Sequence, residues 1–173
     1  ALGLGNPRYD ALRQIDRFSL REKARSQLGI TGESVVLWVG QPDGDHSYKT
    51  IERILPTILR SGAILLFKAH PRDTLYASGA YKELLPFSDV CRDVTDVKDT
   101  KSLCCAADLV VTQFSSVGVE AGYLGTPVLY VLFDDLGMAY LRKYKGYEVV
   151  LWASEDCAFL LRSSDSIQEV QSR

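Results

Sequence analysis

The sequence predicts an α/β protein built on a doubly wound parallel sheet of six strands. Six short apolar runs rich in β-branched residues recur along the chain, and most are continuous rather than alternating, as in strands buried on both faces. Segments with helical spacing separate them. This alternation is typical of a parallel sheet that helices cover on both sides through right-handed crossovers. The predicted strands are Val35–Val39, Ala63–Lys68, Val90–Val94, Leu109–Thr112, Pro127–Val131 and Glu148–Trp152.

The helices are predicted from apolar residues at three- and four-residue spacing. In the segment 48–60, Ile51, Ile54 and Ile58 share one face, and Pro56 is expected to kink the helix or weaken its hydrogen bonding. Together with the strands, these helices indicate a Rossmann-like domain. The predicted helices are Tyr48–Arg60, Leu75–Leu85, Thr100–Ala107, Val117–Leu124, Leu136–Lys145 and Glu155–Arg162.

The chain divides into three parts. Residues 1–30 form a connector in which a turn at Gly5–Asp10 precedes an amphipathic, highly charged helix at Ala11–Leu28. We expect residues 31–162 to form the Rossmann-like domain and residues 163–173 a polar tail.

The charge and hydropathy of the chain argue against two classes of protein, nucleic-acid binders and membrane-spanning proteins. A formal net charge of −2 argues against a nucleic-acid binder, which needs clustered Lys and Arg. No apolar run approaches the roughly 20 residues of a membrane span. We therefore expect a cytoplasmic protein, with any peripheral membrane contact made only through the full-length protein. The chain starts at Ala1 rather than Met, so we also expect a segment upstream of it.

The four cysteines are expected to be buried free thiols. They show no C-x-x-C spacing and lie in predicted strands and helices rather than loops, which disfavours the alternative of a metal or redox site. They are Cys91, Cys104, Cys105 and Cys157.

Polar loops are expected to meet at one edge of the sheet. Open α/β sheets bind ligands beyond the carboxyl ends of the strands, where the strand order reverses. In the common order 3-2-1-4-5-6, that point lies between the first and fourth strands. The loop that begins with Gly40 and Gln41 and the loop 113–116 meet there, and His70-Pro71-Arg72 follows the neighbouring second strand.

Ser115 and Ser116 predict a phosphate site. Hydroxyl groups at the start of a helix put side-chain oxygens and backbone N–H groups where the helix dipole is positive. Serine is also a preferred N-cap, and the two interpretations are compatible. Glu120, one turn further in, is either an acceptor for sugar hydroxyls or an ordinary exposed helix residue. Gly118 lowers helix propensity by about 1 kcal/mol, which indicates close backbone approach to a ligand or to a neighbouring element.

His70 is the main imidazole candidate. Pro71 favours an extended conformation before it, so the ring could donate to a phosphate or to a nucleobase edge. The alternative is a strand-end histidine bonded to backbone. Arg72 could neutralise phosphate charge or be merely solvated. His46 is a weaker candidate, in a loop whose Asp43 and Asp45 could simply cap the next helix. No G-x-G-x-x-G, Walker-type or Ser-His-Asp pattern is present, and no catalytic residue is assigned.

These motifs resemble the C-terminal, donor-binding domain of GT-B-type enzymes over nearly the whole chain. Gly5-Asn-Pro-Arg-Tyr-Asp10 is similar to the entry to that domain in UDP-N-acetylglucosamine 2-epimerases. Lys68-Ala-His-Pro-Arg72 and Phe114-Ser-Ser-Val117 resemble the His-Pro and Ser-Ser motifs of bacterial sialyltransferases and CDP-glycerol-type polyol-phosphate transferases. Glu120-Ala-Gly-Tyr-Leu-Gly-Thr-Pro127 resembles the Glu-Ala-x-x-x-Gly-x-Pro signature of such enzymes.

The resemblance implies specific roles. It places His70 and Pro71 at the nucleotide, Ser115 and Ser116 at the phosphate, and Glu120 at the ribose. It implies a nucleotide-activated sugar or polyol as substrate and no metal. It also implies a missing N-terminal domain of the same polypeptide, to which the catalytic base and the acceptor pocket usually belong.

The leading hypothesis is therefore the donor-binding domain of a GT-B-like glycosyltransferase of cell-envelope polysaccharide biosynthesis, inactive alone. One alternative is a domain of a non-hydrolysing UDP-N-acetylglucosamine 2-epimerase. The epimerases carry Ser-Gly-Gly where this chain has Ser115-Ser116-Val117, which favours a transferase. The other alternative is a Rossmann-like protein-interaction domain without catalysis.

Overall fold

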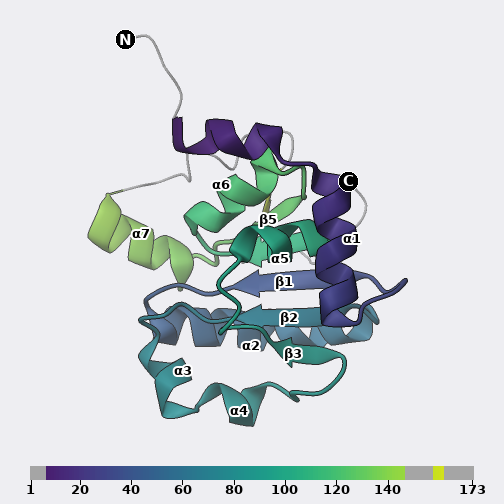
Figure 1. Ribbon diagram of the computed structural model, residues 1–173. Helices are drawn as coiled ribbons and strands as arrows, with labels where there is room; N and C mark the ends of the chain where they lie inside the picture. The colour runs from purple at the N-terminus through teal and green to yellow at the C-terminus, as the bar shows by residue number, and fades with distance from the viewer. Residues whose placement is uncertain (1–6, 147–157, 162–173) are drawn as a thin grey trace.

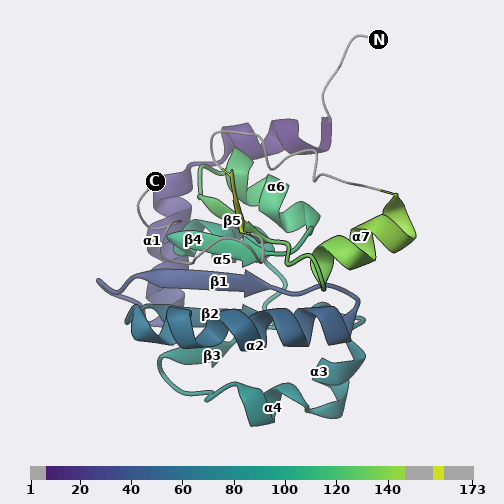
Figure 2. The same cartoon turned by 180° about the vertical axis from the view of Figure 1, so that it is seen from behind.

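The computed structural model describes residues 7–146 and 158–161, which form one six-stranded sheet with helices on both faces (Figures 1 and 2). All strands are parallel, and their order is β3-β2-β1-β4-β5-β6. The predicted fold class is therefore confirmed, and the strand order is the common one considered from the sequence. The strands are β1 (Val35–Val39), β2 (Ile64–Lys68), β3 (Cys91–Asp93), β4 (Leu109–Thr112), β5 (Val128–Val131) and β6 (Ala158–Leu161).

Helices cover the sheet in two layers, and a separate hydrophobic cluster lies under each layer. One layer holds α2 (Gly44–Arg60), α3 (Thr74–Ser78) and α4 (Tyr81–Leu84). The opposite layer holds α1 (Arg17–Leu28), α5 (Thr100–Ala106) and α6 (Ser116–Tyr123). The last helix, α7 (Gly137–Lys145), lies on the side toward which β1 points (Figure 1).

Two of the predicted helices are divided, and their prediction as single helices was wrong. In place of Ala11–Leu28, the 3₁₀ helix η1 (Pro7–Gln14) precedes α1, because the carboxylate of Asp16 accepts from the N–H groups of Phe18 and Ser19 and starts a new helix. In place of Leu75–Leu85, α3 ends at Gly79, whose φ of 84° closes the first helix before α4 begins.

The sixth strand is not where the sequence predicts it. The predicted strand Glu148–Trp152 lies outside the described residues. Strand β6 falls at residues 158–161, where a helix was predicted, and that part of the helix prediction was wrong. Short apolar runs do not separate strand from helix by periodicity. Here the pairing with β5, from Val128↔Ala158 to Val131↔Leu161, decides the matter.

Helix α2 begins four residues before its predicted start. The Asp43 side chain accepts from the N–H of His46 at 3.3 Å and caps the helix, as expected of this residue. The helix continues through the exposed Pro56 to Arg60.

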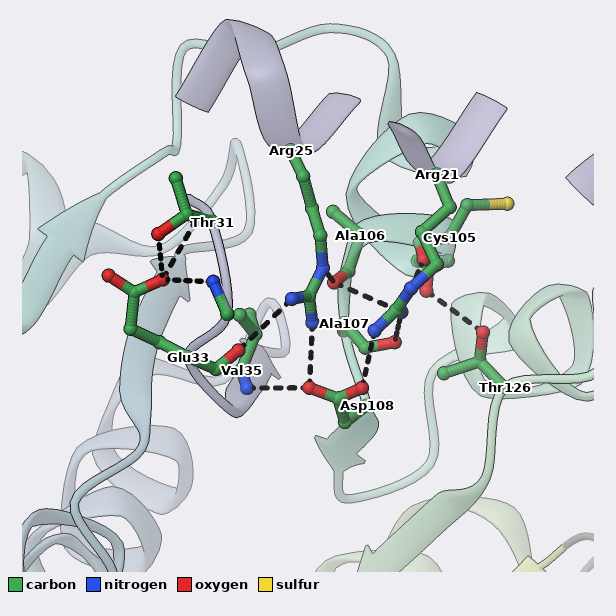
Figure 3. A network of polar contacts seen from close by, with 12 residues as sticks. Arg21, Arg25, Thr31, Glu33, Val35, Cys105, Ala106, Ala107, Asp108 and Thr126 are labelled. Atoms are coloured by element: carbon green, nitrogen blue, oxygen red, sulfur yellow. Dashed lines mark hydrogen bonds and ion pairs between the residues drawn. The ribbon is translucent and has the colours of Figure 1, made fainter. Parts of the chain in front are cut away.

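Arginines of α1 fasten this helix to the domain (Figure 3). Arg21 and Arg25 donate to the carbonyl oxygens of residues 105–107, which end α5 and have no partner within the helix, at 2.9 to 3.3 Å. Both guanidinium groups also pair with Asp108, at 2.5 Å and 2.7 Å. Asp108 in turn accepts from the backbone N–H of Val35 at 2.8 Å. The connector helix is thus bonded to the start of two central strands.

Three of the cysteines are buried free thiols, as predicted. Burial raises the pKa of Cys91 to about 11 and, with the neighbouring Cys105 and Glu120, that of Cys104 to about 12. These thiols are therefore protonated and unreactive near neutral pH. Cys157 lies outside the described residues.

Candidate functional site

The reversal of strand order lies between β1 and β4, as predicted, and the loops after β1 and β2 are in direct contact there. The N–H of Gly40 donates to the carbonyl oxygen of Lys68 at 2.9 Å. A Cβ atom at Gly40 would lie 3.4 Å from the backbone nitrogen of His70. These two predicted site residues are therefore neighbours, and a Cβ at position 40 would be in van der Waals contact with the His70 loop.

His70 is a neutral hydrogen-bond donor. Its half-buried ring accepts the backbone N–H of Arg72 on Nδ1 at 3.1 Å, which leaves the proton on Nε2. Burial, and then the positive charge of Arg72, lower the pKa of His70. Nδ1 of the ring is thus hydrogen-bonded to the backbone, and Nε2–H remains a donor. Pro71 and Arg72 are exposed beside it.

Ser115 is the N-cap of α6. Its hydroxyl oxygen accepts the N–H of Val117 at 3.2 Å, and its φ and ψ of −69° and 142° are those of a capping residue. Ser115 is half-buried, and Ser116, the first helical residue, is exposed. The capping interpretation is confirmed, and contact with a phosphate stays a prediction.

Glu120 is half-buried on the second turn of α6, where its carboxylate contributes to the raised pKa of Cys104 in α5. Its role at a ribose stays a prediction. Gly118 approaches a neighbouring element, since a Cβ there would lie 2.5 Å from the hydroxyl oxygen of Tyr130 in β5.

Gln41 belongs to a buried polar network that the sequence did not predict. Its side chain is 4% exposed and donates from Nε2 to Oγ1 of Thr112 at 3.2 Å. Its backbone N–H donates to Oγ of Ser47 at 2.8 Å. The available signal was polar residues at the end of an apolar strand and on the inner face of a helix, namely Thr112, Gln113, Ser47 and Thr50.

His46 lies in the first turn of α2 with its Nδ1 2.9 Å from Oδ2 of Asp43. Its ring meets that of Tyr140 edge-on at 5.8 Å, and Tyr140 stacks on Phe114 at 5.2 Å. Two ring contacts through Tyr140 of α7 therefore join the first turn of α2 to the loop after β4.

A cavity in the described part of the chain does not involve the predicted site residues. A cavity of about 340 Å³ is bounded by α3, α4 and β3 and includes none of the predicted site residues. Among residues 7–146 and 158–161, no group of three His, Cys, Asp or Glu side chains is arranged to hold a metal ion. No helix in the same part of the chain is long and apolar enough to cross a membrane.

A doubly wound sheet with a capped helix start after β4 and an imidazole donor after β2 has the architecture of domains that bind ligands beyond the carboxyl ends of their strands. The chain belongs to the CDP-Glycerol:Poly(glycerophosphate) glycerophosphotransferase family, whose sequence model matches residues 1–149. Over 134 residues it is 23% identical to a teichoic acid glycerol-phosphate primase of Staphylococcus aureus (strain NCTC 8325 / PS 47). That match covers 78% of this chain and 33% of the relative, so the chain spans about a third of the curated protein.

Solved structures show the same fold. A variant of the wall teichoic acid polymerase TagF soaked with CDPG superposes with a TM-score of 0.64 at 18% identity, covering 99% of this chain and 42% of that one. The ADP-heptose lps heptosyltransferase II of E. coli superposes with a TM-score of 0.53 at 12% identity, covering 66% of this chain and 38% of that one. The resemblance to sialyltransferases and epimerases stays a prediction.

Proposed function

We propose that this chain binds the nucleotide-activated polyol donor, with a CDP-linked polyol as the first candidate, in a glycerophosphotransferase. The observation that carries the proposal is the contact of Gly40 with the His70 loop beside the strand-order reversal, where the Ser115 cap follows the adjacent strand β4, in a chain that belongs to this family.

The spacing of these groups suits one extended ligand. Strands β2 and β4 flank β1, so the loops that carry His70 and Ser115 start about 10 Å apart, which is two strand spacings. A nucleoside with its diphosphate has a comparable length. We place the phosphates at the N-terminus of α6 and the nucleoside toward His70.

The proposed chemistry is electrostatic. In phosphoryl transfer, an acceptor hydroxyl gives its proton to a catalytic base and attacks the phosphorus that bears the polyol, the bond to the bridging oxygen breaks, and the nucleoside monophosphate leaves with added negative charge. The N–H groups that begin α6, the Nε2–H of His70 and the guanidinium of Arg72 are donors suited to that charge. We propose that these donors carry the stabilisation without a metal ion.

The acceptor pocket and the catalytic base are proposed to lie outside these residues, because the chain spans about a third of its curated relative. The isolated chain should then bind a nucleotide weakly and show no turnover.

Calorimetric titration of the chain with CDP, CMP, UDP and GDP tests the proposal. We expect binding of at least one cytidine nucleotide. Ser115→Ala/Ser116→Ala and His70→Ala should each weaken it about tenfold or more, through lost charge-assisted hydrogen bonds. Ser34→Ala, at the amino end of β1, is the matched control and should bind as the unaltered chain does.

Binding of none of the four nucleotides by the folded chain would sink the proposal. The same titration separates the protein-interaction alternative, in which no nucleotide binds. The epimerase alternative predicts an epimerised nucleotide sugar in product analysis of the full-length protein, and the family match favours phosphate transfer over it.

A further inference from the structure

Gln113 is a fully buried amide just after β4, two residues before the Ser115 cap. Its Nε2 donates to Oγ1 of Thr50 at 3.0 Å and to the carbonyl oxygen of His46 at 3.4 Å. Its Oε1 accepts from Oγ of Ser47 at 3.3 Å. All three partners belong to the first two turns of α2. One side chain thus joins the segment that enters the Ser-Ser turn to the start of a different helix.

The same network reaches the end of β1. Oγ of Ser47 accepts the backbone N–H of Gln41 at 2.8 Å, and Oγ1 of Thr112 donates to the carbonyl oxygen of Val39 at 2.8 Å. Ser47 and Thr112 are fully buried. The carboxyl ends of β1 and β4 and the start of α2 are therefore held by directional bonds shielded from water.

A buried amide is an expensive way to fill this space. An apolar side chain of similar size would pack there without needing partners, whereas an amide whose partners are displaced loses free energy. What the amide adds is geometry, since hydrogen bonds allow one position of the segment and apolar contacts tolerate slippage.

We propose that Gln113 is a positioning residue of the donor site, an inference that rests on the proposed function. It holds the Ser115–Ser116 turn, and with it the N–H groups that begin α6, at a set place relative to α2 and the loop at Gly40. Buried itself, Gln113 acts through that turn. Phosphoryl-transfer sites depend on placement to within about 1 Å, so a small shift of the turn weakens donor binding without unfolding the domain.

The test compares Gln113→Met, which keeps the length and removes every hydrogen bond, with Thr50→Val, which removes one acceptor. The matched control is Thr126→Val, which also loses a fully buried hydroxyl bond (Oγ1 to the carbonyl oxygen of Cys104, 2.9 Å) but follows the C-terminal end of α6. The measurements are the Kd for CDP, KM and kcat with CDP-glycerol in the intact enzyme, and Tm.

Gln113→Met should raise the Kd for CDP and the KM for CDP-glycerol about tenfold, and Thr50→Val should raise them less. Thr126→Val should lower Tm about as much as Gln113→Met does and leave the Kd for CDP and the KM for CDP-glycerol unchanged. An unchanged Kd for CDP and KM for CDP-glycerol in Gln113→Met would overturn the inference. So would a rise of both in Thr126→Val equal to that in Gln113→Met. If Gln113→Met does not fold, unchanged constants in Thr50→Val overturn it.

Failure of the proposed function gives a different result. In that case the unaltered protein binds no CDP, or Ser115→Ala/Ser116→Ala binds it normally. If Ser115→Ala/Ser116→Ala binds CDP weakly and Gln113→Met binds it normally, the positioning role is rejected and the proposed function stands.

Discussion

At the scale of single residues, His70 shows how a loop sets the state of a side chain. The backbone N–H of Arg72 occupies Nδ1, so the ring presents Nε2–H whichever ligand approaches. Burial and the charge of Arg72 lower the pKa of His70, which keeps the ring neutral near pH 7. Protonation of Nδ1 would remove the acceptor for that N–H and disturb the turn that carries the predicted site.

This arrangement predicts a pH dependence of stability. Because the pKa of His70 is lower in the folded state, the unfolded chain binds more protons below its own pKa of about 6.5. The contribution of His70 to the free energy of unfolding should therefore be fully present above about pH 6.5, fall as the pH drops through that value, and level off below the pKa of the folded state.

Urea unfolding at about pH 7.5, 6.5 and 5.5 measures this contribution. His70→Gln should flatten that part of the curve, and His46→Gln should retain it. Equal slopes in the unaltered protein and in His70→Gln would contradict the assignment.

At the scale of the element, α6 is defined as much by what it packs against as by its own sequence. Its N-cap is local and visible in the Ser-Ser pair. Its close packing on β5 depends on Gly118, where a Cβ would lie 2.8 Å from Cζ of Tyr130. The ring of Tyr130, which belongs to β5, therefore leaves no room at position 118 for a residue with better helix propensity.

Gly118→Ala should lower the free energy of unfolding by about 1–3 kcal/mol, although alanine favours helices, because the added methyl group overpacks the core. Gly32→Ala is the matched control, since no atom lies within 4 Å of its Cβ position. Urea unfolding measures both variants. The cost at position 118 should shrink in a Tyr130→Phe background, and an equal cost in both backgrounds would show that the ring is not the cause.

At the scale of the whole molecule, the connector is part of the folded unit. Arg21 and Arg25 of helix α1 donate hydrogen bonds to the carbonyl groups that end α5, and Asp108 joins both arginines to β1. Burial acts to raise the pKa of Asp108, but the N–H of Val35 and the charge of Arg21 outweigh it, so the pKa is lowered. Asp108 therefore stabilises the fold above its unfolded pKa of about 3.9, and this effect is lost as the pH falls through the folded value.

Asp108→Asn should lower the free energy of unfolding by about 1–2 kcal/mol at neutral pH and speed amide hydrogen exchange in α1. The difference from the unaltered protein should shrink in acid. Asp89→Asn, at an exposed position, should change stability by less than about 0.5 kcal/mol. Unchanged exchange in α1 would mean that Asp108 does not hold the helix.

The sequence predicted most of the fold because its signals are local. Continuous apolar runs such as Val35–Val39 mark strands buried on both faces, and an aspartate or serine before a helix marks its start. The same reasoning brought Gly40 and His70 to one edge. It failed at residues 158–161, where pairing with β5 overrides a weak local preference.

What the sequence by itself determined is therefore the class of fold and the edge of the sheet where the polar loops meet, since these follow from periodicity and from rules of chain connection. Only the tertiary structure decided how side chains at that edge are used. The side chain of Gln41 turns inward to Thr112, and Gln113 reaches across to α2. Such pairings join residues more than 60 positions apart, and a hydrogen bond between distant residues leaves no periodic signal in the chain.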